Sequence, residues 1–172
     1  MIKNLIKILF YFVLFIPAQV LIMDNIHLFR LVTPFLYLYI IIKIPVNMSR
    51  SSVIAISFFI GIVIDMFSNT LGMHAAACTL VGMVSSPLMN TFSEKDLTEN
   101  DTPSYRTFGV AGFIKYVVSL VFIHHIALFF IESISLFDPI FLIFRIFANV
   151  IFTVLFILII EAFNMERRRR ET

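Results

Sequence analysis

The sequence predicts an all-α integral membrane protein built as a bundle of six transmembrane helices. Hydrophobic residues make up 60% of the chain and charged residues only 14%, and the mean hydropathy is +0.98. A soluble domain of 172 residues could not bury so much apolar surface, because the surface of a small protein is large relative to its mass. The apolar residues fall into six stretches, each near the roughly 20 residues that a helix needs to cross a bilayer.

The six expected spans together form a single polytopic membrane domain, residues 1–172. The first follows Lys3 and Lys7 as in a signal peptide, but its apolar part is long and no A-x-A cleavage pattern follows, so we interpret it as a retained helix. Pro34 lies near the start of the second span, where proline is tolerated. The expected spans cover residues 4–23, 28–44, 51–67, 73–90, 113–131 and 136–163.

The positive charges predict the orientation. Six spans place both termini on one side, and if that side is cytoplasmic, all but two of the 13 Lys and Arg residues lie inside. The exceptions are Arg30, in an outer turn, and Arg145, within the sixth span. This asymmetry follows the positive-inside rule and favours six spans over one more or one fewer. Residues 91–112 then form a cytoplasmic loop, which either links two helices or contacts a cytoplasmic partner.

The basic cytoplasmic tail, residues 164–172, contains four consecutive arginines: Arg167, Arg168, Arg169 and Arg170. A basic cluster beside a membrane helix binds anionic phospholipid with about 1 kcal/mol per basic residue. We therefore favour a lipid anchor, and docking to an acidic cytoplasmic partner is the alternative.

Polar residues inside the spans need an explanation, because a charge at the middle of a membrane helix costs about 2.5–3.5 kcal/mol on insertion scales. Many of them recur at intervals of four, which places them on one helix face. Small and polar residues on such a face favour close packing between membrane helices. We therefore expect the third, fourth and sixth spans to form the packed centre. The relevant series are Ser57, Gly61, Asp65 and Asn69; Cys78, Gly82 and Ser86; and Arg145, Asn149 and Thr153.

The stretch GIVIDMFSNTLGMHAAA joins the third and fourth spans and contains an aspartate and a histidine. Asp65 and His74 have two interpretations. They form a proton or ion relay, together or with Arg145, or Asp65 is a structural carboxylate satisfied by Arg145 or by the start of the fourth helix. Asn69 and Gly72 tolerate turn geometry that other residues do not, which favours a tight turn here.

Catalytic, cofactor and metal sites are not predicted. His124 and His125 are adjacent, so their side chains point about 100° apart on a helix and cannot easily bind one metal. Cys78 is the only cysteine, which excludes an internal disulfide and a cysteine zinc cluster. The H-E-x-x-H, G-x-S-x-G and P-loop patterns do not occur. We therefore expect a protein that is not an enzyme and that binds no cofactor and no nucleic acid.

Three stretches, QVLIMDNIHLF, PFLYLYIIIKIP and GIVIDMFSNTLGMHAAA, occur in this order in a small membrane protein with a basic tail. This arrangement resembles the rod shape-determining protein MreD family, in a form like those of the Bacteroidota. The resemblance implies a non-enzymatic scaffold of the bacterial inner membrane with both termini cytoplasmic. Its partner would be MreC, and through MreC it would connect MreB filaments to the cell-wall synthases and peptidoglycan synthesis.

The same resemblance implies a fold similar to the substrate-binding subunits of energy-coupling-factor vitamin transporters, and such a subunit is the alternative function. Those subunits typically carry an A-x-x-x-A pattern in the first helix, whereas Ala18 is the only alanine of the first span here. The outer loops are also short. In either case, the candidate structural or partner-contact residues are Asp65, Asn69, Gly72, His74, Arg145 and Asn149.

Overall fold

The computed structural model describes residues 2–23, 32–70, 72–93, 101–133 and 138–170, with side chains from 6 to 165 within these ranges. The described residues form an all-helical membrane protein with no strand. Helices α3 to α6 are each long and apolar enough to cross a membrane, and the described part of α1, Ile6–Leu21, is a shorter apolar helix. The helices are α1 Ile2–Leu21, α2 Leu38–Ile42, α3 Arg50–Ser68, α4 Met73–Phe92, α5 Tyr105–Glu132 and α6 Pro139–Arg170.

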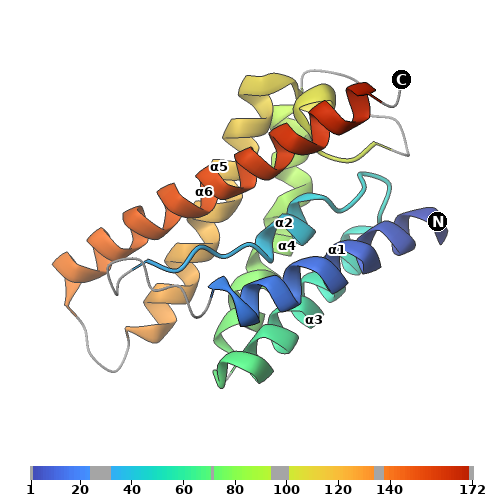
Figure 1. Ribbon diagram of the computed structural model, residues 1–172. Helices are drawn as coiled ribbons and strands as arrows, with labels where there is room; N and C mark the ends of the chain where they lie inside the picture. Colours follow the sequence, from blue (N-terminus) through green and yellow to red (C-terminus); the bar gives the residue numbers. More distant parts are fainter. Residues whose placement is uncertain (1, 24–31, 71, 94–100, 134–137, 171–172) are drawn as a thin grey trace.

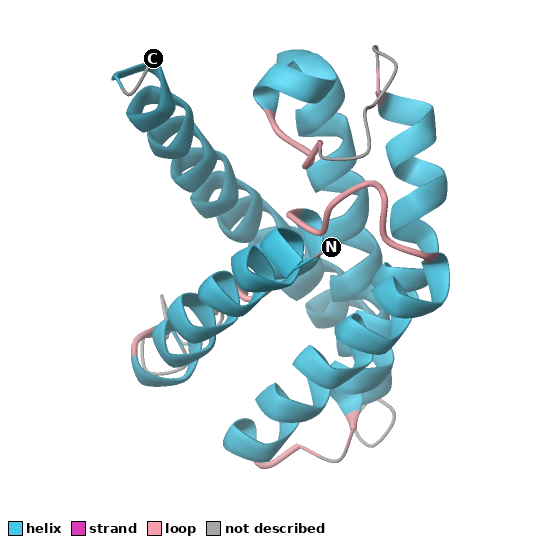
Figure 2. Cartoon of the chain, turned by 90° about the vertical axis from the view of Figure 1, so that its right-hand side faces the viewer, coloured by secondary structure: helices cyan, strands magenta, loops and turns pink. Residues whose placement is uncertain are grey.

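The expected second span, residues 28–44, differs most from the structure. Residues 24–31 lie outside the described part, and only the five residues of α2 are helical between 32 and 44. We call residues 32–44 the core segment, because every residue from Phe35 to Ile44 is buried. In Figure 1 this segment passes between α1 and α6, and Figure 2 shows the loop that leads from it to α3 as a pink trace. A buried irregular segment thus replaces the expected helix.

The core segment runs beside α6 and in the same direction (Figure 1). Thr33 is bonded to Asn149 of α6 at one end, and Lys43 is bonded to Glu161 of α6 at the other. The helical rise of 1.5 Å per residue places Asn149 and Glu161 about 18 Å apart along α6. The segment therefore extends about 18 Å along α6 while being largely non-helical.

Helices α3 and α4 form a close hairpin whose turn follows the sequence prediction. Asn69 ends α3 in the left-handed conformation with φ 54°, and Gly72 precedes α4 with φ 76°. Farther from the turn the two backbones are in close contact at Gly61. A Cβ atom on Gly61 would stand 2.4 Å from the Cα of Ala75, which leaves no room for a side chain there. Ser57 is also buried against Gly82 of α4. The four-residue spacing of small residues in α3 thus marks a true helix contact.

Helices α5 and α6 are both longer than expected. The loop predicted at 91–112 is shorter, since Thr91 and Phe92 belong to α4 and residues 105–112 belong to α5. The Ser104 side chain accepts a hydrogen bond from the Thr107 amide and so caps α5, and a kink at Gly109, with φ 70°, lies in its first turns. Helix α6 continues to Arg170, so most of the expected tail is helical, and the side chains of Arg167 to Arg170 lie outside the described residues.

The packed centre also differs from expectation. Helix α4 lies between α3 and α5, and α5 lies between α4 and α6. The sixth span therefore packs against α5 and the core segment rather than forming a trio with the third and fourth. The core segment supplies most of the largest fully buried side chains, among them Tyr37, Tyr39 and Ile40.

Candidate functional site

Side chains of α1 and α6 hold the first half of the core segment by its backbone. Asn149 accepts a hydrogen bond from the Thr33 amide at 2.9 Å, and Thr153 accepts one from the Phe35 amide at 3.1 Å. The amide of the next residue, Leu36, donates to Gln19 of α1 at 2.7 Å. Non-helical backbone at membrane depth is tolerated only where its polar groups are satisfied inside the protein. The buried polar residues of α1 and α6 meet this requirement for these three amides.

A buried ion pair holds the other end of the core segment. The Lys43 ammonium lies 3.0 Å from the Glu161 carboxylate, and each side chain is only 4% exposed. Lys43 also donates to the Pro103 carbonyl oxygen at 2.5 Å, and the Tyr39 hydroxyl donates to Glu161 at 2.6 Å. Asn164 donates to the Tyr39 hydroxyl in turn. Desolvated charges persist only when they are paired and hydrogen-bonded, as both are here.

Sequence reasoning missed this ion pair. It counted Lys43 among the cytoplasmic charges, at the end of the expected span 28–44, and gave Glu161 no partner, although each residue stands alone as a charge within a long apolar run. A lone lysine and a lone acid at similar membrane depth in two spans were the signal that could have predicted the pair.

Asp65 caps helix α4. Its two carboxylate oxygens accept hydrogen bonds from the amides of His74 at 3.0 Å and Ala75 at 2.9 Å, and the Thr70 hydroxyl donates to it as well. The His74 ring lies farther away, with Nδ1 3.7 Å from the carboxylate. A carboxylate at a helix N-terminus satisfies free amides and interacts favourably with the helix dipole. This geometry matches the structural interpretation in which the start of the fourth helix satisfies Asp65.

The expected Asp65–Arg145 pair does not occur among the described residues. Arg145 instead pairs with Glu132, the last residue of α5, at 2.9 Å, and its guanidinium lies over the Phe129 ring, 4.4 Å from the centroid. The Asp65 carboxylate already accepts hydrogen bonds from the first turn of α4. The polar residues of α3 and α6 thus face different neighbours, because α4 and α5 lie between these two helices.

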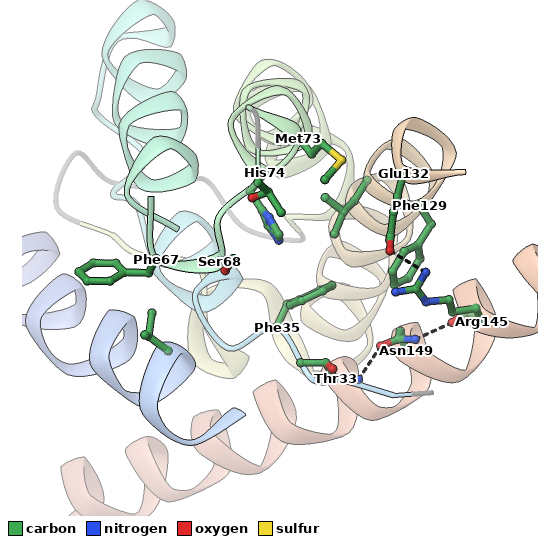
Figure 3. Close-up of a pocket in the computed structure, with 13 residues that line it drawn as sticks. Thr33, Phe35, Phe67, Ser68, Met73, His74, Phe129, Glu132, Arg145 and Asn149 are labelled. Carbon is green, nitrogen blue, oxygen red and sulfur yellow. Dashed lines mark hydrogen bonds and ion pairs between the residues drawn. The ribbon is translucent and has the colours of Figure 1, made fainter. Parts of the chain in front are cut away.

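A cavity of about 500 Å³ lies between the ends of α1, α3 and α5, the first turns of α4 and α6, and the start of the core segment. Figure 3 shows His74 and Phe35 on one side and Arg145, Glu132 and Asn149 on the other. The structure thus brings together three of the predicted residues, His74, Arg145 and Asn149. Asp65 is buried beside His74, whereas Asn69 and Gly72 are exposed in the turn.

The adjacent histidines of α5 are both fully buried and have different partners. His124 Nε2 lies 2.9 Å from the Tyr37 hydroxyl, and His125 Nδ1 lies 2.7 Å from the Val121 carbonyl oxygen. Phe35 packs against both rings. Over the described ranges, no three His, Cys, Asp or Glu side chains are placed to hold a metal ion. The pair therefore joins α5 to the core segment.

Comparisons of the chain with protein-family models, with curated proteins and with solved structures found no match.

Proposed function

We propose that this protein is a non-enzymatic membrane scaffold of the bacterial cell-wall elongation machinery, of the MreD type. In this proposal it binds MreC and so links MreB filaments to peptidoglycan synthesis. The chain crosses the inner membrane six times, the core segment being the second crossing, and both termini are cytoplasmic. The sequence support is the resemblance of three stretches, of which GIVIDMFSNTLGMHAAA is the most specific.

One structural observation carries the proposal: the buried polar residues Asn149, Thr153 and Glu161 of α6 hold the protein's own chain. Ionisable residues inside a membrane protein are by default candidates for a transport path. Here Glu161 binds Lys43 and Tyr39 of the core segment, while Asn149 and Thr153 bind its backbone. These groups therefore fix one arrangement of the bundle. A bundle whose arrangement is fixed in this way is suited to presenting surfaces to partners.

The exposed turn between α3 and α4 is the part of this scaffold that we expect MreC to contact. Asn69 and Gly72 are exposed there, and Asp65 holds the turn in place by capping α4. A rigid loop costs little conformational entropy when it binds a partner, which favours such a turn as a contact surface.

The second candidate function, the substrate-binding subunit of an energy-coupling-factor-type vitamin transporter, is favoured by the cavity of about 500 Å³. Its volume lies within the range of small-molecule sites, and its wall combines aromatic rings with a few polar groups. In this case the cavity would hold a vitamin, and the partner would be an energising membrane complex.

A tagged pull-down from native membranes in mild detergent, followed by mass spectrometry, separates the two candidates. The scaffold proposal expects MreC and cell-wall synthases. Recovery of an ATPase pair with a second membrane subunit, without wall proteins, would replace it with the transporter proposal. Asn69→Gly, which keeps the left-handed backbone but removes the exposed side chain, should lower MreC recovery. Asn90→Ala removes an exposed amide at the far end of α4 and is the matched control.

A further inference from the structure

The cavity between the helix ends has two opposite charges fixed in its wall. Arg145 lies six positions into α6, about 9 Å from the first residue of that helix, and reaches back to Glu132. The guanidinium is held over the Phe129 ring at 4.4 Å. The side chains of Arg145 and Glu132 are 31% and 40% exposed, so both charges remain accessible. The wall therefore presents a cation and an anion side by side in a fixed arrangement.

Two other polar side chains of this region are already hydrogen-bonded within the protein. Asn149 accepts from the Thr33 amide and donates to the Arg145 carbonyl oxygen. Asp65, beside the cavity, accepts from the first amides of α4 and from the Thr70 hydroxyl. Arg145 and Glu132 are the arginine and the carboxylate that line the cavity.

The remaining wall of the cavity combines apolar and polar side chains. Its aromatic part is formed by Phe35 of the core segment, Phe67 of α3 and Phe129 of α5 (Figure 3), and Leu128 of α5 also lines it. An occupant that contacts these rings as well as the two charges combines a charged part with an apolar part. A volume of about 500 Å³ accommodates both.

We propose that this cavity binds an amphipathic zwitterion, a molecule or lipid headgroup in which an ammonium group lies a few bonds from a phosphate or carboxylate. A simple anion would take Arg145 and leave Glu132 without its counter-ion, and a simple cation would do the reverse. A charge that loses its counter-ion in a pair this exposed gives up a modest stabilisation. A zwitterion gives each charge a new partner, because its anionic group faces Arg145 and its ammonium group faces Glu132. This proposal concerns a small ligand and not the binding of MreC, so a failure of the ligand proposal would leave the scaffold proposal intact.

The test is a titration of the purified full-length protein in detergent, followed by native mass spectrometry. The probes are dioleoylphosphatidylethanolamine, dioleoylphosphatidylglycerol, which lacks the ammonium group, and soluble O-phosphoethanolamine. We expect the dissociation constant of the ethanolamine lipid to be at least about tenfold lower than that of the glycerol lipid, because one charge-assisted hydrogen bond contributes about this much to binding. Binding of soluble O-phosphoethanolamine as well would identify a water-soluble zwitterion as the occupant, and binding of the lipid alone would identify a headgroup.

Single substitutions test whether the probe binds in this cavity. Arg145→Gln and Glu132→Gln should each weaken binding of the ethanolamine probe at least about tenfold, whereas Arg106→Gln, at an exposed position in the first turn of α5, should leave it unchanged. Val20→Phe adds bulk to the cavity wall while keeping both charges, so it should also abolish binding. Equal binding of the two lipids, no binding of either ethanolamine probe, or binding that survives both charge removals and Val20→Phe would overturn the proposal. Unchanged circular dichroism and elution volume exclude misfolding as the cause of a loss.

Discussion

Removing one member of the Lys43–Glu161 pair should be among the most destabilising single changes in this protein. Glu161→Gln removes the negative charge that the Lys43 ammonium contacts, although that ammonium group is only 4% exposed. The Pro103 carbonyl oxygen and the new amide oxygen are neutral acceptors and do not replace this charge. Breaking a buried pair in this way costs about 3–5 kcal/mol of unfolding free energy. The double variant Lys43→Met with Glu161→Gln removes both charges and keeps similar volumes, so it should recover most of that loss.

The assay is unfolding by sodium dodecyl sulfate in mixed micelles, followed by circular dichroism. Glu132→Gln is the matched control, since it makes the same change in a pair whose side chains are 31% and 40% exposed, where about 0–1 kcal/mol is expected. The reasoning is refuted if Glu161→Gln costs no more than Glu132→Gln, or if the double variant is as unstable as the sum of its single changes. Either result would mean that neither buried charge depends on the other for its stability.

Three further changes test other contacts of the fold. Asp65→Asn keeps one acceptor oxygen but loses the charge at the start of α4, so it should lower the free energy of unfolding by about 1 kcal/mol. It should also reduce the protein level in membranes and the recovery of MreC. An unchanged protein level and unchanged recovery would contradict the capping role. Gly61→Val should prevent folding, because its Cβ would stand 2.4 Å from the Ala75 Cα, and a normal yield of the monodisperse variant would contradict this close approach. Asn149→Leu leaves the Thr33 amide without this acceptor, and it should cost about 1–3 kcal/mol in the same unfolding assay, whereas a cost near zero would show that the tether is dispensable.

Hydropathy and spacing predicted much of the fold, because most of the chain is helix that packs by one face. The expected spans 51–67 and 73–90 agree with α3 and α4 to within two residues at each end. The turn between them was predictable for a specific reason, since Asn69 and Gly72 are residue types that adopt a positive φ at low cost. At these positions the local sequence determines the local structure.

The core segment could not be recognised in the same way. Hydropathy measures how apolar a stretch is, and a segment surrounded by protein is as apolar as one surrounded by lipid. The residues that make an irregular conformation possible there lie far away in sequence. Asn149 and Thr153 are more than a hundred positions from the amides that they satisfy. The partner of Arg145 depends on the same arrangement, so single-sequence reasoning could not assign it, whereas the lone charges Lys43 and Glu161 were a usable signal for their pair.

The two ends of the core segment explain why this protein tolerates so many polar residues at membrane depth. A continuous helix would satisfy its own backbone and would not need Asn149 or Thr153. Because the segment is not helical at Thr33 and Phe35, the side chains of Asn149 and Thr153 are required there, and replacing them with apolar residues would leave two amides without these acceptors. The ion pair at Lys43 then fixes the register of the segment against α6, since a shift of one position would separate two desolvated charges. The polar residues of α6 thus act as one set that selects a single position of the core segment, and the cavity beside Phe35 keeps its shape only while that position is held.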